Sequence, residues 1–199
     1  MYEYHVVLTI ASILFGVVGN ALYIRSVVRG ATKPHVFTWL SFFIIDIIIF
    51  AVQLTHGGGL GAWVTFASVV AIFIICILAL KRGEKNITLS DWISFAAALA
   101  GIVLWRVMGD PLAAVVLLTA TNTIATIPTI RKSYAKPFEE SISLWSLDIA
   151  KFTLGIFALS SITLTTALFP AGIVVTNSFI VALILFRRAI DRKRASGSV

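Results

Sequence analysis

Charged residues and cysteine are both scarce in this chain. Only 13% of its 199 residues are Asp, Glu, Lys or Arg, whereas 59% are hydrophobic. About a quarter of the residues in soluble domains are charged, so the composition excludes an ordinary soluble domain. The single cysteine, Cys76, lies inside an apolar run, which excludes both a disulfide framework and a thiolate metal site. These shortages point to a membrane protein.

Residue combinations typical of catalysis and metal binding are also missing. The three histidines, His5, His35 and His56, lie outside or at the edges of the apolar runs and show no ligand spacing. No catalytic constellation is visible, so we expect no enzymatic activity, no metal and no cofactor. The N-terminal MYEYH lacks the basic region of a signal peptide, so no cleavable leader is expected.

The hydrophobic residues come in blocks of about 18 to 25, the length that crosses a hydrocarbon core of roughly 30 Å. We therefore predict an all-α membrane protein with seven transmembrane helices. The expected spans are 6–24, 36–54, 60–80, 90–107, 110–130, 142 to a junction within 160–166, and from that junction to 186. Ser90 and Asp91 are expected to cap the fourth span.

Lysine and arginine gather on one side of the predicted membrane. The turns after the first, third, fifth and seventh spans hold 14 of the 16, while Arg106 lies on the other side and Lys151 inside a span. Because cytoplasmic loops are enriched in these residues, we expect the N-terminus outside and the C-terminus in the cytoplasm of a plasma (inner) membrane. The net charge of +7 is then explained by contact with membrane lipid, and no nucleic-acid partner is expected.

Two parts of the chain resemble each other at an offset of 106 residues. This register predicts two parallel three-helix repeats joined by a linker helix, a 3+1+3 layout. The domains are a first repeat (1–86), the linker (87–109), a second repeat (110–188) and a basic cytoplasmic tail (189–199) that we expect to be disordered. The aligned pairs are Ile24-Arg25 with Ile130-Arg131, Trp39 with Trp145, and Lys81-Arg82 with Arg187-Arg188.

Polar side chains from different spans are expected at one level near the bilayer centre. At 1.5 Å rise per residue, Asp46, Asn122, Asp148, Lys151 and Asn177 lie about 9–15 Å from the cytoplasmic ends of their helices. An ionisable group at this depth costs at least ~2.5–3.5 kcal/mol, so it needs a partner or water. We assign Asn122 and Asn177 to solute binding, and the three ionisable residues to charge or proton coupling.

Two pairings remain open for Lys151. Asp148 is three residues away and neutralises it in the first. In the second, Lys151 approaches Asp46 across the repeat interface in at least one conformation, which relieves both buried charges. Thr126 and Asn122 belong to one polar stripe on the fifth span. Hydrogen bonding between helices is the alternative to solute binding for the residues of this stripe.

At the level of topology, the whole chain resembles the PQ-loop superfamily, and within it the SWEET-type seven-span sugar transporters. The resemblance implies a midplane site in which Asn177 is the pocket asparagine. The substrate-binding set then comprises Asn122, Asn177, Thr126 and Trp145, with Pro128 and Pro170 as helix hinges. The residues that carry the resemblance are Pro128-Thr129, Arg131-Lys132, Ser143-Leu144-Trp145 and Thr176-Asn177-Ser178.

Two functions follow as hypotheses. The first is a transporter or facilitator of a small polar solute, sugar-like or amino-acid-like, with alternating access to a midplane site. The second is a non-transporting protein of the same PQ-loop-like architecture that binds a peptide, a lipid or a partner protein. Association of identical chains is left open.

Overall fold

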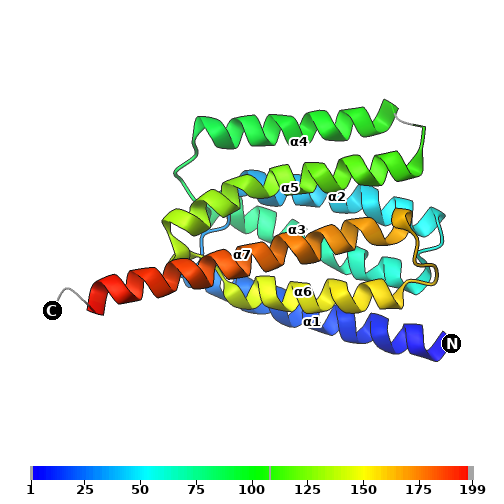
Figure 1. Ribbon diagram of the computed structural model, residues 1–199, viewed down its shortest axis with the longest axis horizontal. Helices are drawn as coiled ribbons and strands as arrows, with labels where there is room; N and C mark the ends of the chain where they lie inside the picture. The colour runs from blue at the N-terminus through cyan, green and yellow to red at the C-terminus, as the bar shows by residue number, and fades with distance from the viewer. Residues whose placement is uncertain (1, 108, 197–199) are drawn as a thin grey trace.

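The computed structural model describes residues 2–107 and 109–196 (Figure 1). Within these residues it contains seven α-helices, two short 3-10 turns and no strand. The helices run side by side along the long axis of the molecule. Their bounds are α1 Tyr2–Val28, α2 Val36–Thr55, α3 Ala62–Arg82, α4 Leu89–Val107, α5 Pro111–Ala135, α6 Ile142–Ala158 and α7 Leu164–Ser196, with turns η1 Gly59–Gly61 and η2 Pro137–Glu139.

Five of the helices, α1, α2, α3, α5 and α7, are long and apolar enough to cross a membrane. The 17 residues of α6 span about 26 Å at 1.5 Å per residue, slightly less than the hydrocarbon core. The apolar part of α4 covers Leu89–Ala100. The fold is therefore all-helical with several candidate spans, as expected for a multi-pass membrane protein.

Polar side chains define where helices in the second half begin. The Asp110 carboxylate accepts a hydrogen bond from the Leu112 backbone N–H at 2.9 Å, and Pro111 occupies the first position of α5. The Ser141 hydroxyl accepts from the Leu144 N–H at 3.3 Å and caps α6. Because these caps satisfy N–H groups that have no partner inside the helix, they fix the start of each helix.

The two halves of the chain share one pattern of neighbouring helices. In the first half α3 contacts both α1 and α2, and in the second half α7 contacts both α5 and α6. The halves meet where α1 packs on α6 and α2 packs on α5. Helices α2 and α6 start at Val36 and Ile142, which are 106 residues apart. Helix α4 lies at the edge of the bundle against α5 and α2 (Figure 1).

Two apolar clusters fill the bundle, one toward each end. One surrounds Tyr23, Trp39 and Trp145 and lies near the end that holds the loops 29–35, 83–88 and 136–141, called here the basic end. The other surrounds Ile45, Leu118 and others of α2, α5 and α7 toward the opposite end. Many large apolar side chains also face outward, as lipid-facing residues do.

Helix α7 extends further than the sequence suggested. It runs to Ser196 and so includes most of the segment expected to be a disordered tail. The Arg187 guanidinium contacts the Asp191 carboxylate at 3.5 Å, four residues along, which supports a continuing helix. Residues 197–199 of the expected tail and the side chain of Arg106 lie outside the described residues.

Candidate functional site

A cavity lies in the middle of the bundle, between the two apolar clusters. It brings together Asn122, Asn177, Trp145 and the three ionisable residues that the sequence placed at midplane depth. Its lining comes from both halves of the chain. The polar lining residues are Asn20 on α1, Asp46 on α2, Ser68 on α3, Asn122 on α5, Asp148 and Lys151 on α6, and Asn177 on α7.

Lys151 is held by several partners at once. Its ammonium group lies 2.6 Å from the Asp148 carboxylate and donates a hydrogen bond to the Ser68 hydroxyl at 2.8 Å. It also lies 4.0 Å from the centre of the Phe152 ring, within range of a cation–π contact. The Asn177 amide donates to the second oxygen of Asp148 at 3.0 Å. Three helices thus contribute to one buried ion-pair network.

The structure places Lys151 against Asp148 and not against Asp46. The approach of Lys151 to Asp46, which we expected in at least one conformation, stays a prediction. Asp148 lies one turn away on the same helix, so the pair forms without moving α2 toward α6. Asp46 faces the same cavity, is 2% exposed and interacts electrostatically with Lys151. Among the described residues, no hydrogen bond or ion pair reaches the Asp46 carboxylate.

Asn122 and Thr126 have different surroundings although they lie one turn apart. The Asn122 side chain lines the cavity and has no hydrogen-bond partner among the described residues. The Thr126 hydroxyl instead donates to the Asn122 backbone carbonyl at 2.8 Å and does not line the cavity. Further along the stripe, Thr129 donates to the Thr38 hydroxyl of α2 at 3.1 Å. The stripe is thus divided between the cavity and helix contacts.

Two tryptophans at equivalent positions form one wall of the cavity. Trp39 and Trp145 are both buried, and their rings stack with centroids 6.2 Å apart and planes 26° apart. Their indoles lie on the side of the cavity nearest the basic end. The aromatic wall therefore separates the polar midplane residues from that end of the bundle.

The two hinge candidates lie away from this cavity. Pro128 is buried within α5, and Pro170 lies within α7, which continues through it. Pro170 lines a smaller space near Gly61 and Leu159, at the end opposite the basic end. At that end Gln53 donates to the Thr166 carbonyl at 3.2 Å and accepts from Thr65 at 2.7 Å.

The cavity is narrow in this conformation. It leaves about 40 Å³ for the centres of water-sized molecules. Since one water requires roughly 10–15 Å³ on this measure, there is room for about three waters. A sugar or amino acid is much larger, so its entry requires the helices to separate.

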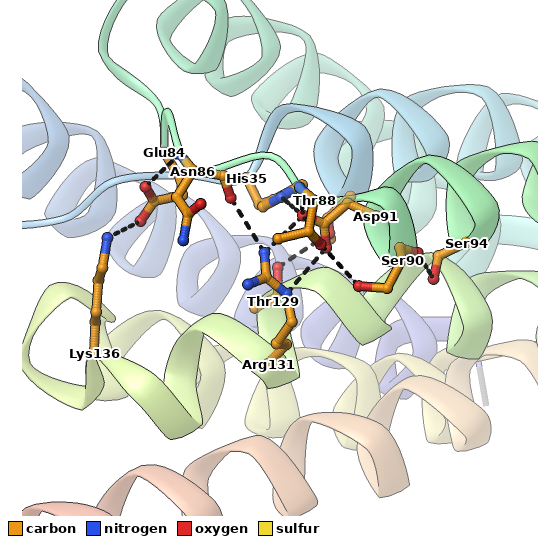
Figure 2. A network of polar contacts seen from close by, with 11 residues as sticks. His35, Glu84, Asn86, Thr88, Ser90, Asp91, Ser94, Thr129, Arg131 and Lys136 are labelled. Carbon is orange, nitrogen blue, oxygen red and sulfur yellow. Dashed lines mark hydrogen bonds and ion pairs between the residues drawn. The ribbon is translucent and has the colours of Figure 1, made fainter.

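A polar network at the basic end ties α4 to α5 and α2 (Figure 2). The Asp91 carboxylate accepts from the Thr88 backbone N–H at 2.8 Å and from the Arg131 guanidinium at 2.6 Å. Helix α4 starts directly after Thr88, so Thr88 occupies the capping position that we had assigned to Ser90 and Asp91. His35 lies 3.4 Å from Asp91, and burial lowers the pKa of this histidine.

Figure 2 also shows an ion pair between the loop after α3 and the end of α5. The Glu84 carboxylate accepts from the Lys136 ammonium at 2.9 Å and from the Asn86 N–H at 2.9 Å. Burial raises the pKa of Glu84, but these hydrogen bonds outweigh it and bring the pKa to about 2. The hydrogen bond to Glu84 raises the pKa of Lys136. Both groups therefore remain charged near neutral pH.

A buried ion pair within the second half fixes Lys132, which in turn contacts the loop after α1. The Lys132 ammonium lies 3.1 Å from the Glu140 carboxylate, with both side chains at most 2% exposed. Lys132 also donates to the backbone carbonyls of Lys33 and Glu139. Burial raises the pKa of Glu140. The partly exposed Lys33 and Glu139 side chains form a second pair at 3.0 Å. The contacts of Lys33 with Lys132 and Glu139 join the two halves at the basic end.

The sequence reading missed Asn20 and Ser68 as cavity residues. Asn20 lies 106 residues before Thr126, so the repeat register aligns it with a residue of the predicted substrate-binding set. Ser68 and Thr65 are the two hydroxyl residues of α3, and Ser68 carried no such signal. Trp39, which the repeat register aligns with Trp145, also lines the cavity.

Comparisons with protein-family models, curated proteins and solved structures found no match to this chain.

Proposed function

We propose that this protein is a multi-pass membrane transporter or facilitator for a small polar solute. In this proposal all seven helices cross the membrane as two three-helix units joined by α4, with the N-terminus outside. The basic end then faces the cytoplasm, in agreement with the positive-inside rule. The layout resembles that of SWEET-type members of the PQ-loop superfamily, in which Asn177 would be the pocket asparagine.

The observation that carries the proposal is the convergence of amide and charged groups from both halves on one buried cavity. Polar groups at membrane depth are costly and in general mark solute or ion pathways. Within the part of the chain that the structure describes, the Asn122 side chain has no hydrogen-bond partner and Asp46 is buried without an ion pair, although both line the cavity. These groups are available to bind a solute at the place where the two halves meet.

Alternating access follows from the way in which the halves pack. Because α1 packs on α6 and α2 on α5, a rocking of one half against the other opens either end of the cavity. In this proposal the ion pairs Lys33–Glu139 and Glu84–Lys136 join the two halves on the cytoplasmic side, and the hydrogen bond from Gln53 to Thr166 joins them on the other side. The narrow cavity corresponds to an occluded state.

Uptake into proteoliposomes tests the proposal. Labelled sugars and amino acids are offered with and without a pH gradient, and at least one solute should accumulate. Asn122→Leu and Asn177→Leu should each abolish its uptake without loss of expression, because both remove hydrogen-bonding groups from the cavity. Thr123→Val is the matched control, since Thr123 is exposed and its hydroxyl donates to the Thr119 carbonyl of its own helix.

The narrowness of the cavity favours a second candidate. A non-transporting protein that binds a peptide, a lipid or a partner needs no path through the bundle, and closure at both ends is then its resting state. Binding without uptake of any solute in the panel would favour this candidate. Solute uptake that both asparagine variants leave intact would contradict the proposed site.

A further inference from the structure

The central cavity holds an unequal number of positive and negative groups. Three ionisable side chains line it: Asp46, Asp148 and Lys151. The Lys151 ammonium contacts Asp148 at 2.6 Å, so these two charges balance each other. With its carboxylate ionised, Asp46 leaves the cavity one negative charge in excess.

Asp46 lacks the contacts that normally stabilise a buried carboxylate. It is 2% exposed, and within the described residues no hydrogen bond or ion pair reaches it. Lys151 acts electrostatically on Asp46 from across the same cavity, but its ammonium group is already held by Asp148 and Ser68. Since an uncompensated charge at membrane depth is costly, the cavity requires one further positive charge beside Asp46.

The surroundings of Asp46 suit an organic cation. Trp39 and Phe42 line the cavity from the same face of α2, seven and four residues before Asp46. Aromatic faces attract an ammonium group, most strongly when water is excluded. The Asn122 amide, which has no hydrogen-bond partner among the residues that the structure describes, adds a hydrogen-bonding group from the opposite half. An anion would be repelled by the excess negative charge, and a neutral polyol would leave that charge unbalanced.

We infer that the cavity binds small solutes carrying a single ammonium group, with Asp46 as the counter-ion and the aromatic residues of α2 beside it. This inference rests on the proposed function and specifies its substrate class. The Asp148–Lys151 pair then contributes hydrogen bonds and no net charge to the site. Neutral sugars and simple carboxylates are poor ligands.

Matched solutes provide the test. Ethanolamine, ethylene glycol and glycolate share a two-carbon skeleton but carry an ammonium, a hydroxyl and a carboxylate group. 3-Aminopropanol, 1,3-propanediol and 3-hydroxypropionate extend the comparison by one carbon. Each is titrated against the purified full-length protein in nanodiscs, and the shift of the thermal unfolding midpoint reports binding. The two amines should raise the midpoint at concentrations at least tenfold lower than their neutral and anionic counterparts.

Two substitutions separate charge from shape. Asp46→Asn keeps the size of the side chain and should weaken amine binding about tenfold or more, because a charge-assisted hydrogen bond is lost. Asp46→Glu keeps the charge and should retain the preference for amines. If Asp46→Asn does not fold, the ranking of the six solutes by the shift that each causes in the wild-type unfolding midpoint still tests the inference.

The result that overturns the inference is distinct from failure of the proposed function. Equal binding of amines and diols, or a preference for the carboxylates, overturns the inference even if the protein transports sugars. Uptake of a neutral solute that depends on a proton gradient, without amine preference, also overturns it, because the positive charge is then a proton. Amine binding without uptake of any solute supports the inference and contradicts the proposed transport function.

Discussion

The Asp148–Lys151 pair can be tested by removing its positive partner. Lys151→Met keeps an unbranched side chain of similar length but removes the ammonium group that bridges Asp148 and Ser68. Two carboxylates, Asp46 and Asp148, then face one cavity without a positive charge. Removing one partner of a buried ion pair costs about 3–5 kcal/mol. Since the Asp148 side chain is 18% exposed, we expect the lower end, about 3 kcal/mol.

The assay is thermal unfolding in detergent. A chain of this size loses about 2–4 °C per kcal/mol, so Lys151→Met should lower the melting temperature by roughly 6–12 °C. Lys81→Met, at an exposed position near the end of α3, is the control and should change it by less than about 2 °C. Adding Asp148→Asn to Lys151→Met should restore more than half of the loss.

Asp46→Asn gives the decisive comparison. Added to Lys151→Met, it should restore less than Asp148→Asn does, because Asp148 is the carboxylate that loses a contact at 2.6 Å. A larger restoration by Asp46→Asn would refute this reasoning. It would mean that the cross-repeat pair between Asp46 and Lys151 dominates in solution.

Two further predictions concern the basic end and the packing around Lys151. The pKa of Glu84 lies near 2 in the folded protein, below its ordinary value of 4.5. Its ion pair with Lys136 therefore stabilises the fold fully above about pH 4.5. This contribution is lost as the pH falls toward 2. The melting temperature should therefore fall less between pH 6 and pH 3 in Glu84→Gln than in the wild type, and an equal fall would contradict the assignment. In Gly16→Ala the new Cβ would lie 2.7 Å from the Lys151 Cδ. Because the ammonium end of Lys151 is held in place, we expect the free energy of unfolding to fall by about 1–3 kcal/mol. Gly155→Ala meets its nearest atom at 3.3 Å and should be tolerated better in the same melting assay; equal effects would count against crowding.

The positions of the helices could be predicted because hydrophobic run length and the 106-residue register both specify them. The predicted starts of the second and sixth spans, Val36 and Ile142, are the first residues of α2 and α6. Helix ends were harder to predict. Helix α5 continues to Ala135, beyond the expected end at Ile130, and stops before the residue that precedes Pro137. Charged residues continue a helix readily, and it is the proline that disfavours helical geometry just before it.

The partners of the midplane residues could be predicted only in part. Depth along a helix follows from residue number, so Asp46, Lys151 and Asn122 were expected at one level, and all three line one cavity. Depth says nothing about rotation of each helix about its axis, which decides whether Lys151 meets Asp46 or Asp148. The contribution of Ser68 depends on that rotation as well, and for this reason the sequence did not indicate it.

The ion pair between Lys33 and Glu139 joins two residues that are separated by the repeat offset of 106. In a symmetric assembly of two identical three-helix units, such a position would meet its own copy across the axis. Two lysines or two glutamates would then repel each other, whereas one of each attracts. A first unit carrying Lys33 is therefore complementary to a second unit carrying Glu139 and poorly complementary to itself. The pair acts as a specificity element that favours assembly of unlike halves over association of like ones.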